Sequence, residues 1–334
     1  MVKAEGIKNA GRTEETAAGM IWSEENLSDG PKAAAVAAKD LARPSALRAP
    51  LEVAFTWAAL IAIEVAYLRY PRPWTMAIAF VLVASRQYAL LILMHDAFHS
   101  LLHRNRRVND FIGSWLIGAP CGSSYWKSRS NHLEHHRRLG ERTDPDLFLY
   151  CSGPPREKRG VAAFARHFLS LMLGEQILFT HMGSASERQA PLRERIGRIV
   201  PILLPVVLVQ FAILALFWLA GAWLNYLLLW VLPLLTLAVL FNGLRAFCDH
   251  ANLSDDPGAA RDRLITYFSH PLERFFLAPF HMNFHAEHHL FPYVPHYNLP
   301  KVRSRLWESD EQRAAIQWRR GYLGFVREFL RARG

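Results

Sequence analysis

The sequence predicts an all-α integral membrane protein, in which four transmembrane helices form two hairpins below a cytoplasmic helical cap. The first observation is that four apolar runs each approach the roughly 20 residues that a helix needs to cross a bilayer core. The second is that short turn sequences join these runs in pairs. The third is that histidines, 15 in total, cluster just beyond the apolar runs.

The apolar runs lie at about 51–70, 74–94, 199–220 and 223–243. The first two are separated only by Pro71-Arg72-Pro73, and the last two only by Gly221-Ala222. Because proline and glycine interrupt helices and favour turns, each pair is predicted to be a helical hairpin. An even number of crossings places both termini on the same side of the membrane.

Positive charge indicates which side that is. Seven Lys and Arg residues precede residue 51, sixteen lie between residues 104 and 198, and twelve follow residue 250. Because short loops rich in these residues stay in the cytoplasm, we expect cytoplasmic termini and a cytoplasmic central segment, in a bacterial inner membrane or the endoplasmic reticulum. The apolar but partly charged segment 161–182 is expected to be an interfacial or re-entrant helix.

Composition divides the 334-residue chain into three parts. Residues 1–50 lack helical periodicity and a signal-peptide core, and are expected to form a partly disordered cytoplasmic arm. Residues 51–305 form the membrane domain, with a cap made of 95–198 and 244–305, and residues 306–334 form a basic cytoplasmic tail. The content of 51% hydrophobic residues excludes a disordered or fibrous protein, and three cysteines are too few for a disulfide framework.

Histidine clusters carry the chemical information. The first holds His95, His99 and His103, and the two others are the triplets His132, His135, His136 and His285, His288, His289. Positions i, i+3 and i+4 share one face of a helix, so these imidazoles can reach a common ion. Because crowded imidazoles repel one another when protonated, the pattern favours bound metal. The isolated His167, His181, His270 and His296 are interpreted as surface or hydrogen-bonded side chains.

Ligand number and type indicate two metal ions. A single zinc takes about three protein ligands, far fewer than the clustered histidines. The carboxylate type of di-iron bundle uses Glu-x-x-His, which this sequence lacks, and the scarcity of cysteine argues against iron–sulfur clusters. Imidazole binds iron, copper, nickel and zinc, so ligand type alone leaves iron as a preference.

Helix geometry brings the clusters to one height. At about 1.5 Å per residue, the second helix travels roughly 31 Å from Trp74 to His95, so His95 and His99 emerge at the cytoplasmic end. Continuing the fourth helix past Gly243 lifts His250 roughly 10 Å further, close to the height of His99. A metal transporter would instead place its ligands midway through the crossing helices.

Four motifs carry a family resemblance: HDAFHSLLH at 95–103, NHLEHHRRLGERTDPD at 131–146, RAFCDH at 245–250 and HMNFHAEHHLFPYVPHYNLP at 281–300. Over about residues 50–305 the chain resembles the membrane fatty acid desaturases, histidine-box proteins that include related hydroxylases and ketolases. The resemblance implies a non-haem di-iron centre that uses O2 to oxidise an unactivated C–H bond of a lipid-like substrate. Fatty acyl desaturation is the main expectation.

The resemblance implies nine iron ligands: His95, His99, His132, His135, His136, His250, His285, His288 and His289. His103 and His281 continue the same helical faces and are expected to be additional ligands or to support them. Six carboxylates are expected to orient ring N–H groups: Asp96, Glu134, Asp144, Asp146, Asp249 and Glu287. Arg86 lies in the second apolar run, where it is expected to line a substrate tunnel or pair within the bundle.

The electrons are expected from another protein, since the sequence has neither a His-Pro-Gly-Gly haem signature nor cysteines for an iron–sulfur cluster. The basic segments would attract an acidic donor, such as a ferredoxin or a cytochrome with its reductase, and anionic lipid. Positive-inside topology alone accounts for the same charge, and no nucleic-acid partner is expected. The alternatives are a hydroxylase, monooxygenase or ketolase of a carotenoid or other hydrophobic substrate and, in another class, a His-rich metal transporter.

Overall fold

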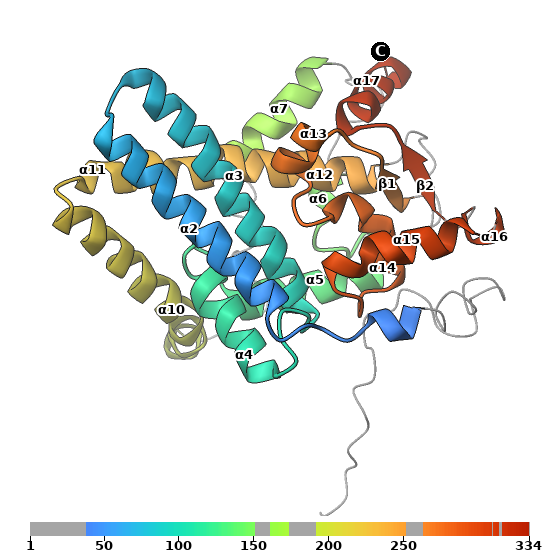
Figure 1. Ribbon diagram of the computed structural model, residues 1–334, viewed down its shortest axis with the longest axis horizontal. Coiled ribbons are helices and arrows are strands. Elements are labelled where there is room, and N and C mark those ends of the chain that lie inside the picture. Colours follow the sequence, from blue (N-terminus) through green and yellow to red (C-terminus); the bar gives the residue numbers. More distant parts are fainter. Residues whose placement is uncertain are drawn as a thin grey trace, which may run out of the picture.

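The computed structural model describes residues 38–150, 161–173, 192–251, 263–308, 310–313 and 316–333. In this part the protein is mostly helical, with long helices at one end and short elements at the other (Figure 1). Of the expected N-terminal arm, residues 1–37 lie outside the described part, and Lys39–Leu41 forms a single 3₁₀ turn.

The first two long helices are α2 (Arg48–Arg69) and α3 (Pro73–Phe98), which lie side by side (Figure 1). Pro73 takes the first helical position of α3, and the Thr75 hydroxyl oxygen accepts the Arg72 N–H at 2.9 Å. Both features favour a helix start directly after the turn. Each helix is long and apolar enough to cross a membrane, and α3 continues past the predicted end at residue 94 to the edge of the first histidine cluster.

The second pair of long segments begins with α10 (Leu192–Leu219). After a turn at Gly221, whose φ is +69°, α11 (Trp223–Asn225) starts a helix that passes through π-helical turns at Tyr226–Val231 and Leu234–Ala238 and ends as α12 (Val239–His250). The stretch Trp223–His250 is long and apolar enough to cross a membrane, whereas Leu203–Leu219 of α10 is a shorter apolar helix. Three of the four predicted crossings thus have spans of sufficient length, and the crossing at 199–220 stays a prediction.

Large apolar side chains are exposed along these long helices. Phe55 of α2 is 72% exposed and Leu219 of α10 is 82% exposed, and similar residues recur on all of the long helices. A soluble protein rarely exposes so continuous an apolar surface, whereas a lipid bilayer covers it without cost. The long helices therefore mark a membrane protein.

Short elements form the other end of the molecule, and we call this part the cap. Those before α10 are α4 (Arg106–Phe111), a π-helical segment Ile112–Gly118, α5 (Tyr125–Arg138), α6 (Leu147–Tyr150) and α7 (Val161–Met172). Those after α12 are β1 (Ile265–Tyr267), α13 (Pro271–Leu277), α14 (His285–Leu290), α15 (Leu299–Trp307), α16 (Asp310–Arg313), β2 (Gln317–Arg319) and α17 (Tyr322–Arg333), with 3₁₀ turns at Met282–Phe284 and His296–Asn298.

The helix α7 is the described part of the expected interfacial segment 161–182. It packs against α12, burying Phe168 and Leu171 while Leu169 stays exposed. The rest of the segment, from residue 174, lies outside the described residues.

The all-α prediction was wrong in one respect, because β1 and β2 form a parallel pair with Thr266 opposite Trp318. Both strands have three residues, too few for the alternating pattern that reveals a strand in a sequence. The residues after 305, expected to be a tail, pack on the cap: the Tyr322 ring stacks on Tyr267 at 4.1 Å, and Phe325 is buried.

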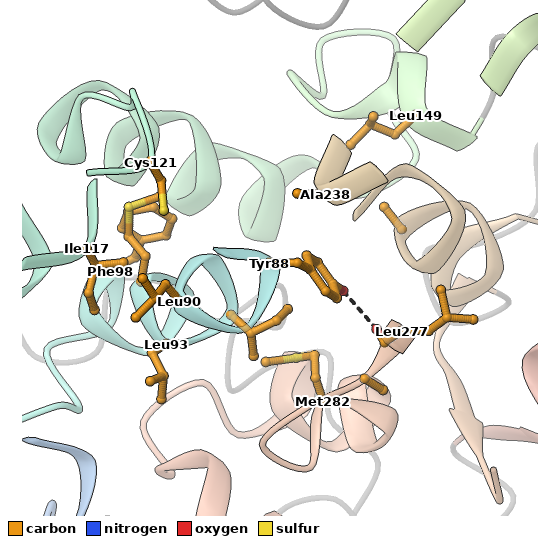
Figure 2. Close-up of a cluster of buried hydrophobic side chains, with 14 of the residues drawn as sticks. Tyr88, Leu90, Leu93, Phe98, Ile117, Cys121, Leu149, Ala238, Leu277 and Met282 are labelled. Atoms are coloured by element: carbon orange, nitrogen blue, oxygen red, sulfur yellow. Dashed lines mark hydrogen bonds between the residues drawn. The ribbon is translucent and has the colours of Figure 1, made fainter. Parts of the chain in front are cut away.

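The hydrophobic core joins α3 to the cap (Figure 2). Tyr88 of α3 points towards the end of α13, where its hydroxyl donates to the Leu277 carbonyl at 2.8 Å (Figure 2). Two residues earlier in α3, the Arg86 guanidinium donates to the Phe275 carbonyl at 3.2 Å and lies 4.1 Å from the centre of the Phe275 ring. Arg86 thus contacts α13, a short helix of the cap, and its expected role in a tunnel or in pairing within the bundle stays a prediction. Together these contacts hold the end of α13, the helix that precedes the last histidine triplet.

Candidate metal centre

Four helices end or pass at one place in the cap and deliver histidines to it. The last turn of α3 carries His95, and the helix ends at His99, after which Ser100 turns the chain with a φ of 61°. The last residue of α12 is His250. The two remaining helices, α5 and α14, each carry a triplet.

The triplet on α5 faces inwards because the helix is amphipathic. Ser124 caps the start of α5, where its hydroxyl accepts the Lys127 N–H, and the outer face of the helix carries an ion pair between Arg137 and Glu134 at 3.1 Å. The α14 triplet is completely enclosed, with His288 and His289 both at 0% exposure.

The imidazoles form two groups. In the first group, the ligand atoms of His95, His132, His136 and His288 all lie within 4.8 Å of one another. His99 joins this group, because its Nε2 lies 2.9 Å from Nε2 of His132.

The second group contains His135, His250 and His289, whose ligand atoms also lie within 4.8 Å of one another. His285 joins this group through its Nε2, which lies 3.1 Å from Nε2 of His250 and 3.0 Å from Nε2 of His289. The groups adjoin, since the rings of His136 and His289 stack at 4.1 Å. The structure thus brings all nine predicted ligands together, five in one group and four in the other.

These distances suit metal ions. Two imidazole nitrogens bound at right angles to one ion, each at about 2.1 Å, lie about 3.0 Å apart. The buried Nε2 of His95 has no hydrogen-bond partner among the described residues, although a buried polar nitrogen normally has one. Two sets of buried imidazole nitrogens this close together are chemically suited to bind transition-metal ions.

The electrostatics of the groups favour neutral imidazole, the form that binds metal. Burial and the neighbouring histidines hold the pKa values of His132, His136, His285, His288 and His289 well below the usual range. Burial also lowers the pKa of His99 to about 4. His135 is the exception: burial opposes its protonation, but Asp144 outweighs burial and raises its pKa.

Among the predicted carboxylates, Asp144 contacts the ring of a candidate ligand. Its oxygens lie 2.9 and 3.1 Å from Nδ1 of His135, so Nε2 of that ring is left to face the group. The Tyr150 hydroxyl donates to the same carboxylate, and the Gly140 N–H does so at 3.2 Å. In the same way, the Arg263 carbonyl lies 3.0 Å from Nδ1 of His250.

The other predicted carboxylates have different partners. Glu287 accepts a hydrogen bond from the Thr266 hydroxyl, and burial raises its pKa to about 7. Asp249 pairs with Arg245 at 2.8 Å, whereas Glu134 points outwards to the arginines of its own helix.

Asp146 contributes its backbone N–H to Asp144, and burial raises the pKa of its carboxyl. The two additional histidines lie outside both groups. Nδ1 of His103 accepts the Asn105 N–H at 2.9 Å, and His281 adopts a left-handed φ of 61° in the turn before α14.

Sequence reasoning missed three neighbours of the centre. Tyr150 and the Arg263 carbonyl hold ligand-orienting positions, but neither belongs to a recognisable motif. His296, interpreted as a surface or hydrogen-bonded side chain, is hydrogen-bonded, but its burial between Asp96 at 2.7 Å and Glu52 at 2.8 Å was not foreseen. The pairing of Asp96 with His296 also explains why this carboxylate does not contact a ligand ring.

Comparisons with known proteins agree with this geometry. The sequence model of the fatty acid desaturase family matches residues 71–321. A β-carotene ketolase from Paracoccus sp. (strain PC1) is 28% identical over 216 residues, which are 64% of this chain and 73% of the ketolase. The dihydrorhizobitoxine desaturase of Bradyrhizobium elkanii is 26% identical over 267 residues, which are 73% of this chain and 72% of the desaturase.

A zeaxanthin 4-ketolase from Chlamydomonas reinhardtii is 27% identical over 242 residues, which are 69% of this chain but only 44% of that protein. The family match covers well over half of the chain, and within it lie all four helices that carry the histidine groups. The resemblance drawn from the four motifs is therefore confirmed. The chain belongs to the fatty acid desaturase family and is an oxidoreductase of the kind that oxidises C–H bonds in lipid-like molecules.

Proposed function

We propose that this protein desaturates a fatty acyl chain, with O2 as co-substrate and two iron ions held by the nine histidines. The observation that carries the proposal is the convergence of those histidines from four helices into two adjoining groups. When bound, a non-haem iron pair supplies an oxidant strong enough to break an alkyl C–H bond.

The residues of the chain hold and shield that centre. The neutral imidazoles offer Nε2 atoms, and Asp144 and the Arg263 carbonyl fix the ring orientations of His135 and His250. Eight of the nine histidines are at most 8% exposed, which keeps bulk water away from reactive species.

The proposed topology has four crossings in two hairpins, a cytoplasmic cap and cytoplasmic termini. It is supported by the three long apolar helices, by the apolar part of α10 and by the basic residues of the central segment. In this arrangement the centre lies directly beyond the ends of α3 and α12, where an acyl chain rising from the bilayer can reach it. An external electron donor, such as a ferredoxin or a cytochrome with its reductase, completes the reaction.

A second candidate function is the ketolation or hydroxylation of a carotenoid or similar hydrophobic substrate. It is supported by the names of the ketolase relatives, whose similarity extends over about two thirds of this chain. The same ligand set serves either outcome, so product chemistry has to separate them.

The first experiment measures iron per chain in detergent-purified protein, by elemental analysis with Mössbauer spectroscopy. We expect two irons in the parent, a sharp loss in His135→Ala, and no loss in His103→Ala, which removes a histidine outside both groups. Stoichiometric zinc after an iron-replete anaerobic preparation, or no metal at all, would refute the di-iron proposal.

The second experiment supplies ¹⁸O2 and candidate lipids or carotenoids. Desaturation releases both oxygen atoms as water, so its product carries no label, whereas hydroxylation or ketolation leaves ¹⁸O in the product. A labelled product would replace the desaturase proposal with the second candidate.

A further inference from the structure

A basic hollow lined by an aromatic residue lies at the tip of the cap. It has a volume of about 660 Å³ and is lined by Arg313 of α16, by Trp318 and Arg319 of β2, and by Arg320 directly after β2. Both elements lie at the end of the molecule opposite the turns that join α2 to α3 and α10 to α11 (Figure 1). In the proposed topology this tip faces the cytoplasm.

The charge of this region suits an acidic partner. Residues 299–334 contain nine Lys and Arg against four Asp and Glu. Within the hollow, Arg313 pairs with Asp310 and Arg319 lies 3.8 Å from Glu328, while Arg320 is exposed. Trp318 is 45% exposed, and an exposed tryptophan among arginines is typical of protein interfaces.

The backbone connects Trp318 to the metal centre over a short path. Trp318 lies opposite Thr266 in the parallel strand pair, and neighbouring strands are about 4.8 Å apart. The Thr266 hydroxyl donates to Glu287, which stands between His285 and His288 on α14. The strand β2 is therefore separated from α14, which carries the last histidine triplet, by the buried strand β1 alone.

Side chains give a second connection. The Trp318 ring lies 5.9 Å from the Phe268 ring, and the Arg303 guanidinium lies 3.9 Å from the centre of Phe268. The same guanidinium lies 5.7 Å from the ring of Phe284, the residue before His285. Packed side chains thus lead from the hollow to the first ligand of the last triplet.

We propose that the hollow around Trp318 is the docking surface for an acidic one-electron carrier protein, and that its electrons reach the histidine centre through β2, β1 and α14. This inference rests on the proposed function. Each encounter passes one electron from the reduced carrier to the centre. Two encounters supply two electrons, which reduce O2 to two waters together with two protons from the medium and two hydrogen atoms from the substrate.

The test uses the full-length, iron-loaded protein in nanodiscs, with an acidic [2Fe–2S] ferredoxin and, separately, a soluble cytochrome b5 as donors. The variant Arg319→Glu/Arg320→Glu reverses charge at the hollow, and Arg320→Glu alone changes only an exposed side chain. The matched control Arg106→Glu/Arg107→Glu makes the same charge change on α4, away from β2 (Figure 1). Stopped-flow absorbance follows oxidation of the donor as ionic strength is raised.

We expect the double variant to lower the second-order rate at low salt roughly tenfold or more, with a weaker salt dependence, and the control to stay within about twofold of the parent. Iron content should be unchanged in all variants, and so should single-turnover product formation when the protein is reduced anaerobically with dithionite, freed of excess reductant and then mixed with O2. Trp318→Leu, which keeps the charge, should lower the maximal rate at saturating donor.

Several outcomes would overturn the docking proposal: an unchanged donor rate in the double variant, an equal loss in the control, or a parent that neither donor reduces. If the double variant reacts with the donors like the parent but binds phosphatidylglycerol vesicles more weakly, the hollow contacts the membrane surface and not a carrier protein. Failure of the proposed function is distinguishable, because even the parent would then form no oxidised product when it is reduced anaerobically and afterwards mixed with O2.

Discussion

Replacement of Asp144 by asparagine tests how the second histidine group holds its metal. The carboxylate accepts hydrogen bonds from Nδ1 of His135 at 2.9 Å, from the Tyr150 hydroxyl and from the Gly140 N–H at 3.2 Å. Asparagine keeps the shape and one acceptor oxygen. It replaces the other oxygen with an NH2 donor, which opposes the remaining donors, and it removes the negative charge beside the imidazole.

Loss of a carboxylate that orients a metal-bound histidine typically lowers metal affinity 10–100-fold, which corresponds to about 1.4–2.8 kcal/mol. Asp144 contacts His135 of the second group, so one of the two irons should leave first when iron per chain is followed against increasing chelator. Glu134→Gln is the matched control, because Glu134 lies on α5 next to His135 but its carboxylate points outwards to Arg137. Equal chelator resistance of Asp144→Asn and the parent would refute the reasoning, whereas loss of both irons with a lower thermal midpoint of the metal-free protein would indicate misfolding.

Three further predictions concern the support of the centre. Burial opposes the charge on His296, but its two carboxylate partners raise its pKa to about 9. Protonated His296 therefore stabilises the fold fully below the unfolded pKa of about 6.5, and this stabilisation is lost as the pH rises through 9. The loss in the free energy of unfolding is on the order of 3 kcal/mol. The thermal midpoint of the parent should therefore fall more steeply over this range than that of His296→Gln, and parallel curves would contradict the assignment. In Gly113→Ala the new Cβ would lie 2.6 Å from the ring of buried Tyr125, the first residue of α5, so we expect about 1–3 kcal/mol of destabilisation and a lower iron content, measured by thermal unfolding and elemental analysis. Arg86→Gln should lose the charged hydrogen bond to the Phe275 carbonyl, at about 1.5–3 kcal/mol, without moving the position of oxidation; a shifted position, detected by mass spectrometry of the product, would instead support a tunnel role.

The clustering of the candidate ligand histidines could be predicted from the sequence because helical spacing is local information, whereas His250 belongs to no such cluster and was expected from the family resemblance. Which of the six expected carboxylates would contact a candidate ligand ring could not be predicted, because their partners depend on tertiary packing. Glu134 shows the limit: it is two residues from His132, about 200° around the helix, and so lies on the opposite face. Asp144 contacts His135 from the loop after α5, and no periodic sequence pattern predicts this contact.

The elements that sequence reasoning missed are also those that depend on long-range contacts. The strands β1 and β2 are three residues each and lie about 50 positions apart in the chain, so neither a period nor a turn sequence marks them. His296 stood alone in the sequence, and its role depends on Asp96, which lies 200 positions away.

The spacing of the triplets explains why one helix can serve two metal sites. Successive residues on a helix are about 100° apart, so residues i and i+4 nearly coincide in direction, while residue i+3 points to the other side of residue i. On α5 the pair His132 and His136 enters the first group and His135 enters the second. On α14 the arrangement is reversed, because His285 and His289 enter the second group and His288 the first.

Two facing helices with the same short motif therefore supply three imidazoles to each group. The pair His95 and His99 from α3 completes one group, and His250 from α12 completes the other. A helix-borne pair brings two nitrogens and a helix terminus brings one, which accounts for five ligands in the first group and four in the second. The second group therefore has one imidazole nitrogen fewer than the first. In this group Asp144 holds the ring of His135, and the Tyr150 hydroxyl holds Asp144.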